Sequence, residues 1–182
     1  WVPQMADSAE VLRGIRRAAG VRYAALTPNM RGLSDALDAG ADEVAVFGSA
    51  SEGFSRANIN ASVEESLARF EPVMEAAGAE GLRVRGYVSC VVECPYDGPV
   101  APAEVARVAE ALWAMGCYEI SLGDTIGRGK PEAVAAMLAA VREVVPVERL
   151  AGHFHDTSGH ALENIEVALA EGVRVFDAAV GG

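Results

Sequence analysis

The chain of 182 residues is 51% hydrophobic and 23% charged, the composition of a globular domain with a sizeable core. Its 26 acidic and 15 basic residues give a net charge of −11 without a basic stripe, which argues against a nucleic-acid partner. No apolar run approaches the roughly 18 residues of a membrane span, and the first residues, WVPQMADSAE, carry neither a basic head nor an apolar signal core. We therefore expect one globular domain without a membrane span or a visible export signal.

Short runs rich in β-branched residues alternate with segments of helical spacing along the chain. The six expected strands cover residues 21–28, 43–50, 83–90, 118–124, 150–156 and 173–180. A capping box from Ser62 to Glu65 opens one helix, and the same spacing predicts helices within residues 101–116 and 130–146. Strands that alternate with helices of this length predict βαβ units and a parallel sheet.

The strand pattern leaves two α/β architectures open. A G-x-G-x-x-G motif does not follow the first strand, so a dinucleotide-binding fold loses its main support. A flavodoxin-like open sheet and part of a (β/α)8 TIM barrel remain, and a whole barrel has eight units in about 250 residues. The first segment runs into a helix capped by Asp7 or Ser8, and the last strand runs into VGG with no helix behind it. We therefore expect about six βα units of a TIM barrel, with residues 1–182 as a single partial catalytic domain.

All three histidines of the chain lie in one stretch, AGHFHDTSGHALENIEVAL, residues 151–169. His153 and His155 are two residues apart on an expected strand, so both side chains point to the same face. In a barrel that face is the interior, and active sites lie at the carboxyl ends of the strands. The pair predicts half of a divalent-metal site, and the alternative is two structural polar residues. His160 falls in the following helix, at the surface or behind the ligands.

The stretch SLGDTIGRGKP, residues 121–131, has the same form, with a polar cluster at the end of a strand. Ser121 points to one face of that strand, and Asp124 emerges at its end. Asp124 has two possible roles. It could cap the next turn through the amides of Thr125 or Ile126, or it could be a carboxylate at the same end of the barrel as the histidines.

Arg85 and Tyr87 share one face of the expected strand 83–90. An arginine inside a barrel is costly without an anionic partner. That partner could be Asp124 or a substrate carboxylate, so Arg85 is a candidate substrate-binding residue.

Two of the strand ends are followed by longer polar segments. Residues 47–60 are expected to form a strand end and a polar loop, in which Asn58 is available for ligand contacts. Cys90 and Cys94 lie in the loop after strand 83–90, and together with Cys117 they form neither a paired zinc motif nor a disulfide framework. Structural thiols in a reducing compartment are the expectation.

Four stretches together resemble one enzyme family. GHFHDTSGHALENIEVAL, YEISLGDTIGRGKP, RGYVSCVVECPYDG and TPN are similar to the 3-hydroxy-3-methylglutaryl-CoA (HMG-CoA) lyases of the DRE-TIM metallolyase superfamily. The resemblance runs from WVPQM to VGG. Related isopropylmalate and homocitrate synthases share the H-x-H motif but usually continue H-N-D, whereas this chain reads His155-Asp156-Thr157.

The resemblance implies a lyase that cleaves HMG-CoA to acetyl-CoA and acetoacetate by retro-Claisen chemistry, as in leucine degradation and ketone-body formation. His153 and His155 match the family's ligands for Mg²⁺ or Mn²⁺, and His153 is also counted as catalytic. Asp124 matches the acid/base aspartate near the substrate hydroxyl, and Ser121 and Asn58 match positions near the acyl-CoA. A divalent ion at the C3 hydroxyl and the C5 carboxylate would ease removal of the hydroxyl proton, which a base must then accept.

Parts of the family's site have no match in this chain. Its first-strand Arg-Asp pair and second-strand Glu would precede Trp1, and its glycine-rich loop, with a proton-donating Cys and an Asn ligand, would follow Gly182. The 182 residues thus supply two of four expected metal ligands, and on their own they are expected to be nearly inactive. A homodimer is expected to cover open sheet edges. The expected location is the cytoplasm of a bacterium or the mitochondrial matrix of a eukaryote.

Two other functions remain open on the sequence alone. The first is an acyl-CoA-condensing synthase of the same superfamily, of the isopropylmalate or homocitrate type. The second is a non-catalytic α/β binding module in which the histidines are structural.

Overall fold

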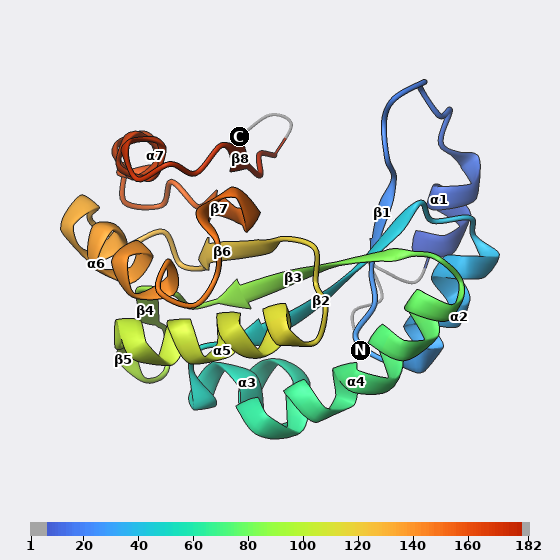
Figure 1. Ribbon diagram of the computed structural model, residues 1–182, viewed down its shortest axis with the longest axis horizontal. Coiled ribbons are helices and arrows are strands. Elements are labelled where there is room, and N and C mark those ends of the chain that lie inside the picture. The colour runs from blue at the N-terminus through green and yellow to red at the C-terminus, as the bar shows by residue number, and fades with distance from the viewer. Residues whose placement is uncertain (1–6, 180–182) are drawn as a thin grey trace.

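The computed structural model describes residues 7–179, and its main feature is a six-stranded parallel sheet with helices along one face (Figure 1). The strands of this sheet are β1 (Ala24–Leu26), β2 (Glu43–Ser49), β3 (Arg83–Ser89), β6 (Ile120–Asp124), β7 (Leu150–Phe154) and β8 (Val175–Phe176). The helices are α1 (Ser8–Gly14), α2 (Met30–Asp38), α3 (Glu52–Ile59), α4 (Val63–Ala79), α5 (Pro102–Ala114), α6 (Pro131–Val141) and α7 (Ala161–Ala170). A short antiparallel pair, β4 (Glu93–Cys94) with β5 (Gly98–Pro99), and a 3-10 turn at Val147–Arg149 complete the described elements.

The sheet has the topology of a (β/α)8 barrel. Its strand order is β1-β2-β3-β6-β7-β8, and every neighbouring pair is parallel. The strands therefore follow one another in space as they do in the chain, as in a TIM barrel. A flavodoxin-like sheet would reverse direction at a switch point, and the described sheet has none, so that alternative is excluded. Each strand of this sheet lies within a predicted range, whereas the short pair of β4 and β5 was not predicted. Between residues 7 and 179, no helix is both long enough and apolar enough to cross a membrane.

The prediction of a polar loop after the second strand is wrong in one respect. Residues 52–59 form helix α3, in which the Ser51 side chain caps the start by accepting a hydrogen bond from the Phe54 amide. Asn60 ends the helix in a left-handed conformation, with φ of 50°. Asn58 therefore lies on a helix and is exposed. Gly53 and the many small polar residues in this stretch favour a loop, but the serine cap stabilises the helix.

The long helix α4 begins where the sequence predicts. The Ser62 side chain accepts a hydrogen bond from the Glu65 amide at 3.0 Å, and the Glu65 carboxylate accepts one from the Ser62 amide at 2.7 Å. This reciprocal pair satisfies two amides that would otherwise lack partners at the helix start. The helix buries Leu67, Phe70 and Val73 against the sheet.

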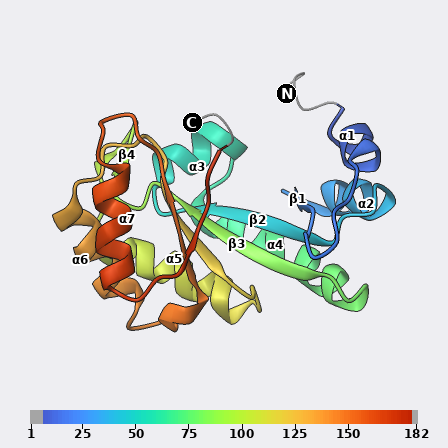
Figure 2. The same cartoon turned by 90° about the horizontal axis from the view of Figure 1, so that it is seen from above.

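The two faces of the sheet differ in character. Alternate residues point to opposite faces, and one set is apolar and packs under the helices: Val44, Val46, Val84, Val88, Ile120 and Leu122. Both views place α4 and α5 along β2, β3 and β6 on this same face (Figures 1 and 2). The other set faces the barrel interior and includes the polar residues Arg85, Tyr87 and Ser121. Its register places Tyr87 beside Ser121, and Gly123 beside His153. Residues far apart in the chain thus form neighbouring rows on the interior face.

Candidate metal centre and active site

The two histidines of the H-x-H motif converge at the carboxyl end of β7. His153 lies within the strand, and His155 follows one residue after its last member. Their Nε2 atoms are 3.2 Å apart, and their ring centroids are 5.1 Å apart. Two ligands of one divalent ion lie about 2.8–3.4 Å apart when each bond is about 2.0–2.1 Å and the angle is between octahedral and tetrahedral. The spacing of the two Nε2 atoms therefore fits a shared metal ion.

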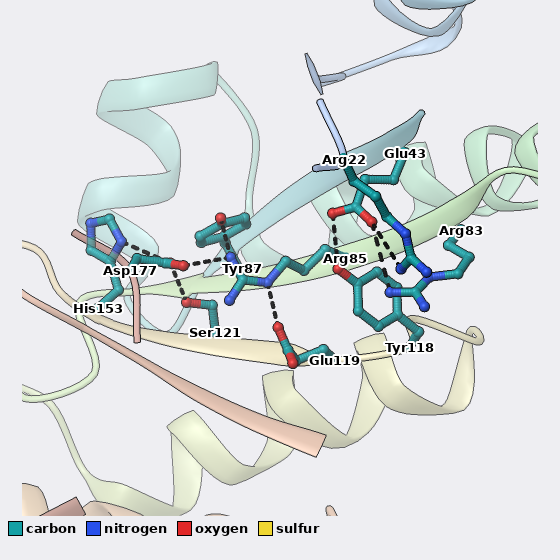
Figure 3. A network of polar contacts seen from close by, with 10 residues as sticks. All are labelled: Arg22, Glu43, Arg83, Arg85, Tyr87, Tyr118, Glu119, Ser121, His153 and Asp177. Carbon is teal, nitrogen blue, oxygen red and sulfur yellow. Dashed lines mark hydrogen bonds and ion pairs between the residues drawn. The ribbon is translucent and has the colours of Figure 1, made fainter. Parts of the chain in front are cut away.

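The second ring nitrogen of His153 faces a carboxylate that sequence analysis did not single out. Asp177 follows β8 directly, and its Oδ2 lies 3.1 Å from His153 Nδ1. The same oxygen accepts a hydrogen bond from Ser121 Oγ at 2.9 Å, and Oδ1 accepts one from Arg85 Nη1 at 2.7 Å (Figure 3). Its own amide donates to the Gly152 carbonyl at 2.9 Å, which holds it beside β7. Asp177 thus joins residues of β3, β6 and β7.

The anionic partners of Arg85 differ from those that the sequence suggested. Arg85 Nε donates to Glu119 Oε1 at 2.7 Å, and its Nη1 also reaches the Tyr87 hydroxyl at 2.5 Å (Figure 3). The Arg85 side chain is only 10% exposed. The pairing with Asp124 is therefore wrong, and Glu119 and Asp177 take its place.

The hydrogen bonds around Asp177 keep its carboxylate ionised. Burial by itself would raise its pKa, but the hydrogen bonds from His153 and Arg85 and the charge of Arg85 outweigh burial and lower the pKa to about 2. Among residues 7–179, three or more His, Cys, Asp or Glu side chains do not gather in a way that could hold a metal. The described residues thus offer the two imidazoles as ligands, with Asp177 behind one of them.

Asp124 lies on the other side of the sheet from Ser121. Strand alternation places it with Ile120 and Leu122, on the helix-covered face. It is fully buried, and its carboxylate accepts hydrogen bonds from the amides of Gly129 at 2.8 Å and Arg128 at 3.3 Å. The expected capping contact with Thr125 or Ile126 is therefore displaced further along the loop. A hydrogen bond to either histidine is not among its contacts in the described structure.

The loop that Asp124 holds lies against the backbone of His155. The Ser158 amide donates to the Gly127 carbonyl at 3.0 Å. A side chain at Gly127, where φ is +63°, would lie 2.8 Å from the His155 carbonyl oxygen and from the Thr157 amide. The Asn164 side chain donates to the Gly129 carbonyl at 2.9 Å and holds the loop from the side of α7. Close packing of the two loops thus fixes the backbone at His155.

The remaining candidates lie further from the two rings. Asn58 lines a small cavity at the carboxyl end of β2 with Phe47, Ser49 and Ser55. His160 is the residue before α7, and its Nδ1 lies 2.7 Å from Glu163 Oε2. The three cysteines are buried thiols, as expected.

A second polar cluster occupies the amino ends of the strands. Tyr118 donates to Glu43 at 3.0 Å, and Glu43 pairs with Arg83 at 3.7 Å and Arg22 at 3.8 Å (Figure 3). The Arg83 guanidinium also lies 3.7 Å from the centre of the Tyr118 ring. At this end of a barrel, such residues serve stability and not chemistry.

Comparison with known proteins assigns the chain to a family. The family model described as HMGL-like matches residues 1–182. This chain belongs to the HMGL-like family. The 3-hydroxy-3-isohexenylglutaryl-CoA/hydroxymethylglutaryl-CoA lyase of Pseudomonas aeruginosa is 60% identical over 182 residues, and the mitochondrial hydroxymethylglutaryl-CoA lyase of Bos taurus is 58% identical. The whole chain is covered in both alignments, but it spans only 61% and 56% of these relatives.

Solved structures agree with the HMGL-like assignment. The HMG-CoA lyase of Brucella melitensis superimposes with a TM-score of 0.98 at 64% identity, over 100% of this chain and 64% of that one. An HMG-CoA lyase from Acinetobacter baumannii in complex with coenzyme A and 3-methylmalate has a TM-score of 0.92 at 32% identity, over 98% of this chain and 58% of that one. The partial (β/α)8 barrel expected from the sequence is thereby confirmed.

Proposed function

We propose that the full-length protein that contains this chain is an HMG-CoA lyase, which cleaves its substrate to acetyl-CoA and acetoacetate with the help of a divalent metal ion. The observation that carries the proposal is the convergence of His153 and His155, with Nε2 atoms 3.2 Å apart, in a member of the HMGL-like family. Relatives with 58–60% identity over this chain carry the lyase name. The coenzyme A complex of an A. baumannii relative supports an acyl-CoA substrate.

His153 and His155 would hold the ion through Nε2, with Mg²⁺ or Mn²⁺ as the candidates. When bound, such an ion would polarise substrate oxygens as a Lewis acid. The protein's own residues shape the site around the two imidazoles. Asp177 and Arg85 fill the interior beside His153, and loop 125–130 holds the backbone of His155 in place. His153, which the family resemblance counts as catalytic, contacts the buried carboxylate of Asp177.

The predicted roles of two residues continue as parts of this proposal. Asp124 would act as acid/base only if its carboxylate left the amides of Arg128 and Gly129, because it is fully buried in this conformation. Asn58 is exposed near the carboxyl end of β2, where an acyl-CoA could reach it. A homodimer and the absence of a nucleic-acid partner stay predictions. Relatives at 56–60% identity include a bacterial lyase and eukaryotic lyases named mitochondrial or cytoplasmic, and a bacterial cytoplasmic or mitochondrial location of this protein stays a prediction.

The test uses the full-length protein and its three histidines. Cleavage of HMG-CoA is followed by the appearance of acetoacetate, with and without Mg²⁺ or Mn²⁺. We expect His153→Gln and His155→Gln each to lower kcat/KM by about a hundredfold or more, since loss of metal assistance is worth several kcal/mol and each 1.36 kcal/mol is tenfold. His160→Gln is the matched control and should retain activity, because the side-chain partner of His160 in the described structure is Glu163, on the side of α7, away from the two rings.

Two outcomes would contradict the proposal. Condensation of acetyl-CoA with a 2-oxo acid, in place of HMG-CoA cleavage, would favour the synthase alternative. Equal activity of all three histidine variants and of the wild type would return the histidines to a structural role.

A further inference from the structure

The carboxylate of Asp177 is the point at which the interior polar residues meet. It touches side chains from three other strands: Arg85 of β3, Ser121 of β6 and His153 of β7. We propose that Asp177 is the positioning residue of the metal centre. It sets the tautomer and the orientation of His153, and Arg85 and Ser121 act on the site through it. The proposal rests on the metal site of the proposed function.

The donors and acceptors around His153 determine which of its ring nitrogens carries the proton. An ionised carboxylate has acceptors only, so the contact of 3.1 Å between Asp177 Oδ2 and His153 Nδ1 requires the proton to be on Nδ1. A neutral imidazole then carries a lone pair on Nε2, which is the atom that faces His155. A metal ligand needs that lone pair. Asp177 thus selects the tautomer that can bind a metal, as carboxylates behind metal-bound histidines do.

Arg85 and Ser121 hold the carboxylate in this orientation. Arg85 binds Oδ1 at 2.7 Å, and its Nε is fixed by Glu119 at 2.7 Å. Ser121 binds Oδ2 at 2.9 Å, on the same oxygen that faces His153. Arg85 and Ser121 thus reach the metal centre through Asp177, and their expected contacts with the acyl-CoA stay predictions.

The same geometry predicts the effect of Asp177→Asn. The amide group has one oxygen and one NH₂, and the NH₂ cannot face Arg85, because both groups are donors only. The amide oxygen therefore stays toward Arg85, and the NH₂ takes the place of Oδ2 beside His153 Nδ1. His153 must then accept at Nδ1 and carry its proton on Nε2. The variant keeps the size of the side chain and presents the wrong tautomer to the metal.

The experiment measures the tautomer and the metal affinity separately, on the full-length protein. Nitrogen-15 NMR of histidine-labelled, metal-free protein reports which nitrogen of His153 is protonated, with His153→Gln to assign the signal. Titration with Mn²⁺, followed by the electron paramagnetic resonance of the free ion, gives the dissociation constant. For Asp177→Asn we expect a shift of the proton from Nδ1 to Nε2 and Mn²⁺ binding weakened by about 10–100-fold. The control Asp38→Asn removes the same charge from an exposed position at the end of α2, and it should change neither readout.

The outcomes separate this proposal from the proposed function. If the wild type binds Mn²⁺ and Asp177→Asn binds it equally well, with the proton still on Nδ1, the positioning role is overturned and the lyase function stands. If the wild type binds no Mn²⁺ and cleaves no HMG-CoA, the proposed function fails. The NMR comparison of the metal-free proteins still tests whether Asp177 sets the tautomer of His153.

A second variant covers the case in which Asp177→Asn does not fold. Asp177→Glu keeps the charge but moves the carboxylate by one methylene, so the proton should stay on Nδ1 while the ring loses its orientation. We expect weaker Mn²⁺ binding than in the wild type, and unchanged binding would overturn the proposal.

Discussion

Replacement of Arg85 by Gln should destabilise the protein more than any other single charge removal on the interior face. Arg85 is the cation between two carboxylates, with contacts of 2.7 Å to Glu119 and 2.7 Å to Asp177. The three side chains are 10%, 14% and 21% exposed, so water compensates little of the lost attraction. Removal of one member of a buried ion pair costs about 3–5 kcal/mol, because the partner stays buried without its counter-charge. We expect a loss in this range at pH 7.

The destabilisation caused by Arg85→Gln has an upper limit that depends on pH. In Arg85→Gln, Asp177 can lose its buried and unpaired charge by taking up a proton. For a group with an unfolded pKa of 3.8, protonation at pH 7 costs about 4.4 kcal/mol. This cost falls as the pH falls. In the wild type, the lowered pKa of Asp177, about 2, contributes stability above pH 3.8 that is lost as the pH falls toward 2. In the variant the pKa of Asp177 is raised, so the penalty is relieved at low pH. The difference between wild type and variant should therefore shrink as the pH falls from 7 to 4.

Urea denaturation of the full-length protein at pH 7 and pH 4.5 measures this difference, and Arg107→Gln is the matched control. Arg107 contacts Glu104 on α5, with the two side chains 51% and 53% exposed. An exposed pair of this kind contributes about 0–1 kcal/mol. If Arg85→Gln costs no more than Arg107→Gln, or if its cost grows at pH 4.5, the interior ion pairs do not stabilise the fold as argued.

Three further predictions concern the loops and the thiols. If the Asp124 carboxylate is an acid/base, Asp124→Asn should lower turnover by at least about a hundredfold and remove one limb of the pH–rate profile. An unchanged pH–rate profile with weaker Mn²⁺ binding would show that Asp124 acts only by holding its loop. Gly127→Ala should weaken Mn²⁺ binding and lower the melting temperature, because the added methyl would lie 2.8 Å from the His155 carbonyl oxygen at a φ of +63°. The control Gly78→Ala, whose methyl would meet open space on α4, should neither weaken Mn²⁺ binding nor lower the melting temperature. Burial raises the pKa of Cys117 to about 12, so its alkylation by iodoacetamide at pH 8 should be at least about a thousandfold slower than that of a free cysteine, as followed by mass spectrometry.

The strands of the sheet could be predicted because their signals are local. Each strand is a short run of β-branched residues between helical segments, and this alternation predicts parallel βαβ units. The spatial order, which separates a barrel from a flavodoxin-like sheet, is a long-range property that the strand pattern alone left open. The convergence of His153 and His155 is also a local result, since a spacing of two places both side chains on one face. Helix α3 was missed because its decisive feature is the hydrogen bond between the Ser51 side chain and the Phe54 amide, in a stretch whose composition favours a loop.

The partners of the interior residues could not be predicted because they lie far apart in the chain. Asp177 is 92 residues from Arg85 and 56 from Ser121. Strand periodicity shows which face a residue occupies, but not which residue of another strand lies opposite. One available signal was overlooked. Asp124 follows Ile120 and Leu122 at a spacing of two, and those residues are apolar, so the same parity that places the histidines inside places Asp124 on the helix side.

The charges of the interior face favour a cation beside His153. Arg85 contributes one positive charge, whereas Glu119 and Asp177 contribute two negative charges, so these three residues leave one negative charge uncompensated. Because little water reaches these side chains, the interior gains from a cation close to the carboxylate that Arg85 does not neutralise alone. Besides Arg85, two titratable groups lie beside Asp177 in the described structure: His153, whose Nδ1 contacts its carboxylate, and the Tyr87 hydroxyl, which also contacts Arg85. A metal ion bound to Nε2 of His153 would add positive charge on the side of the ring away from Asp177 and keep the hydrogen bond from Nδ1. The surplus of negative charge that Arg85 neutralises only in part therefore favours a cation at this end of the sheet.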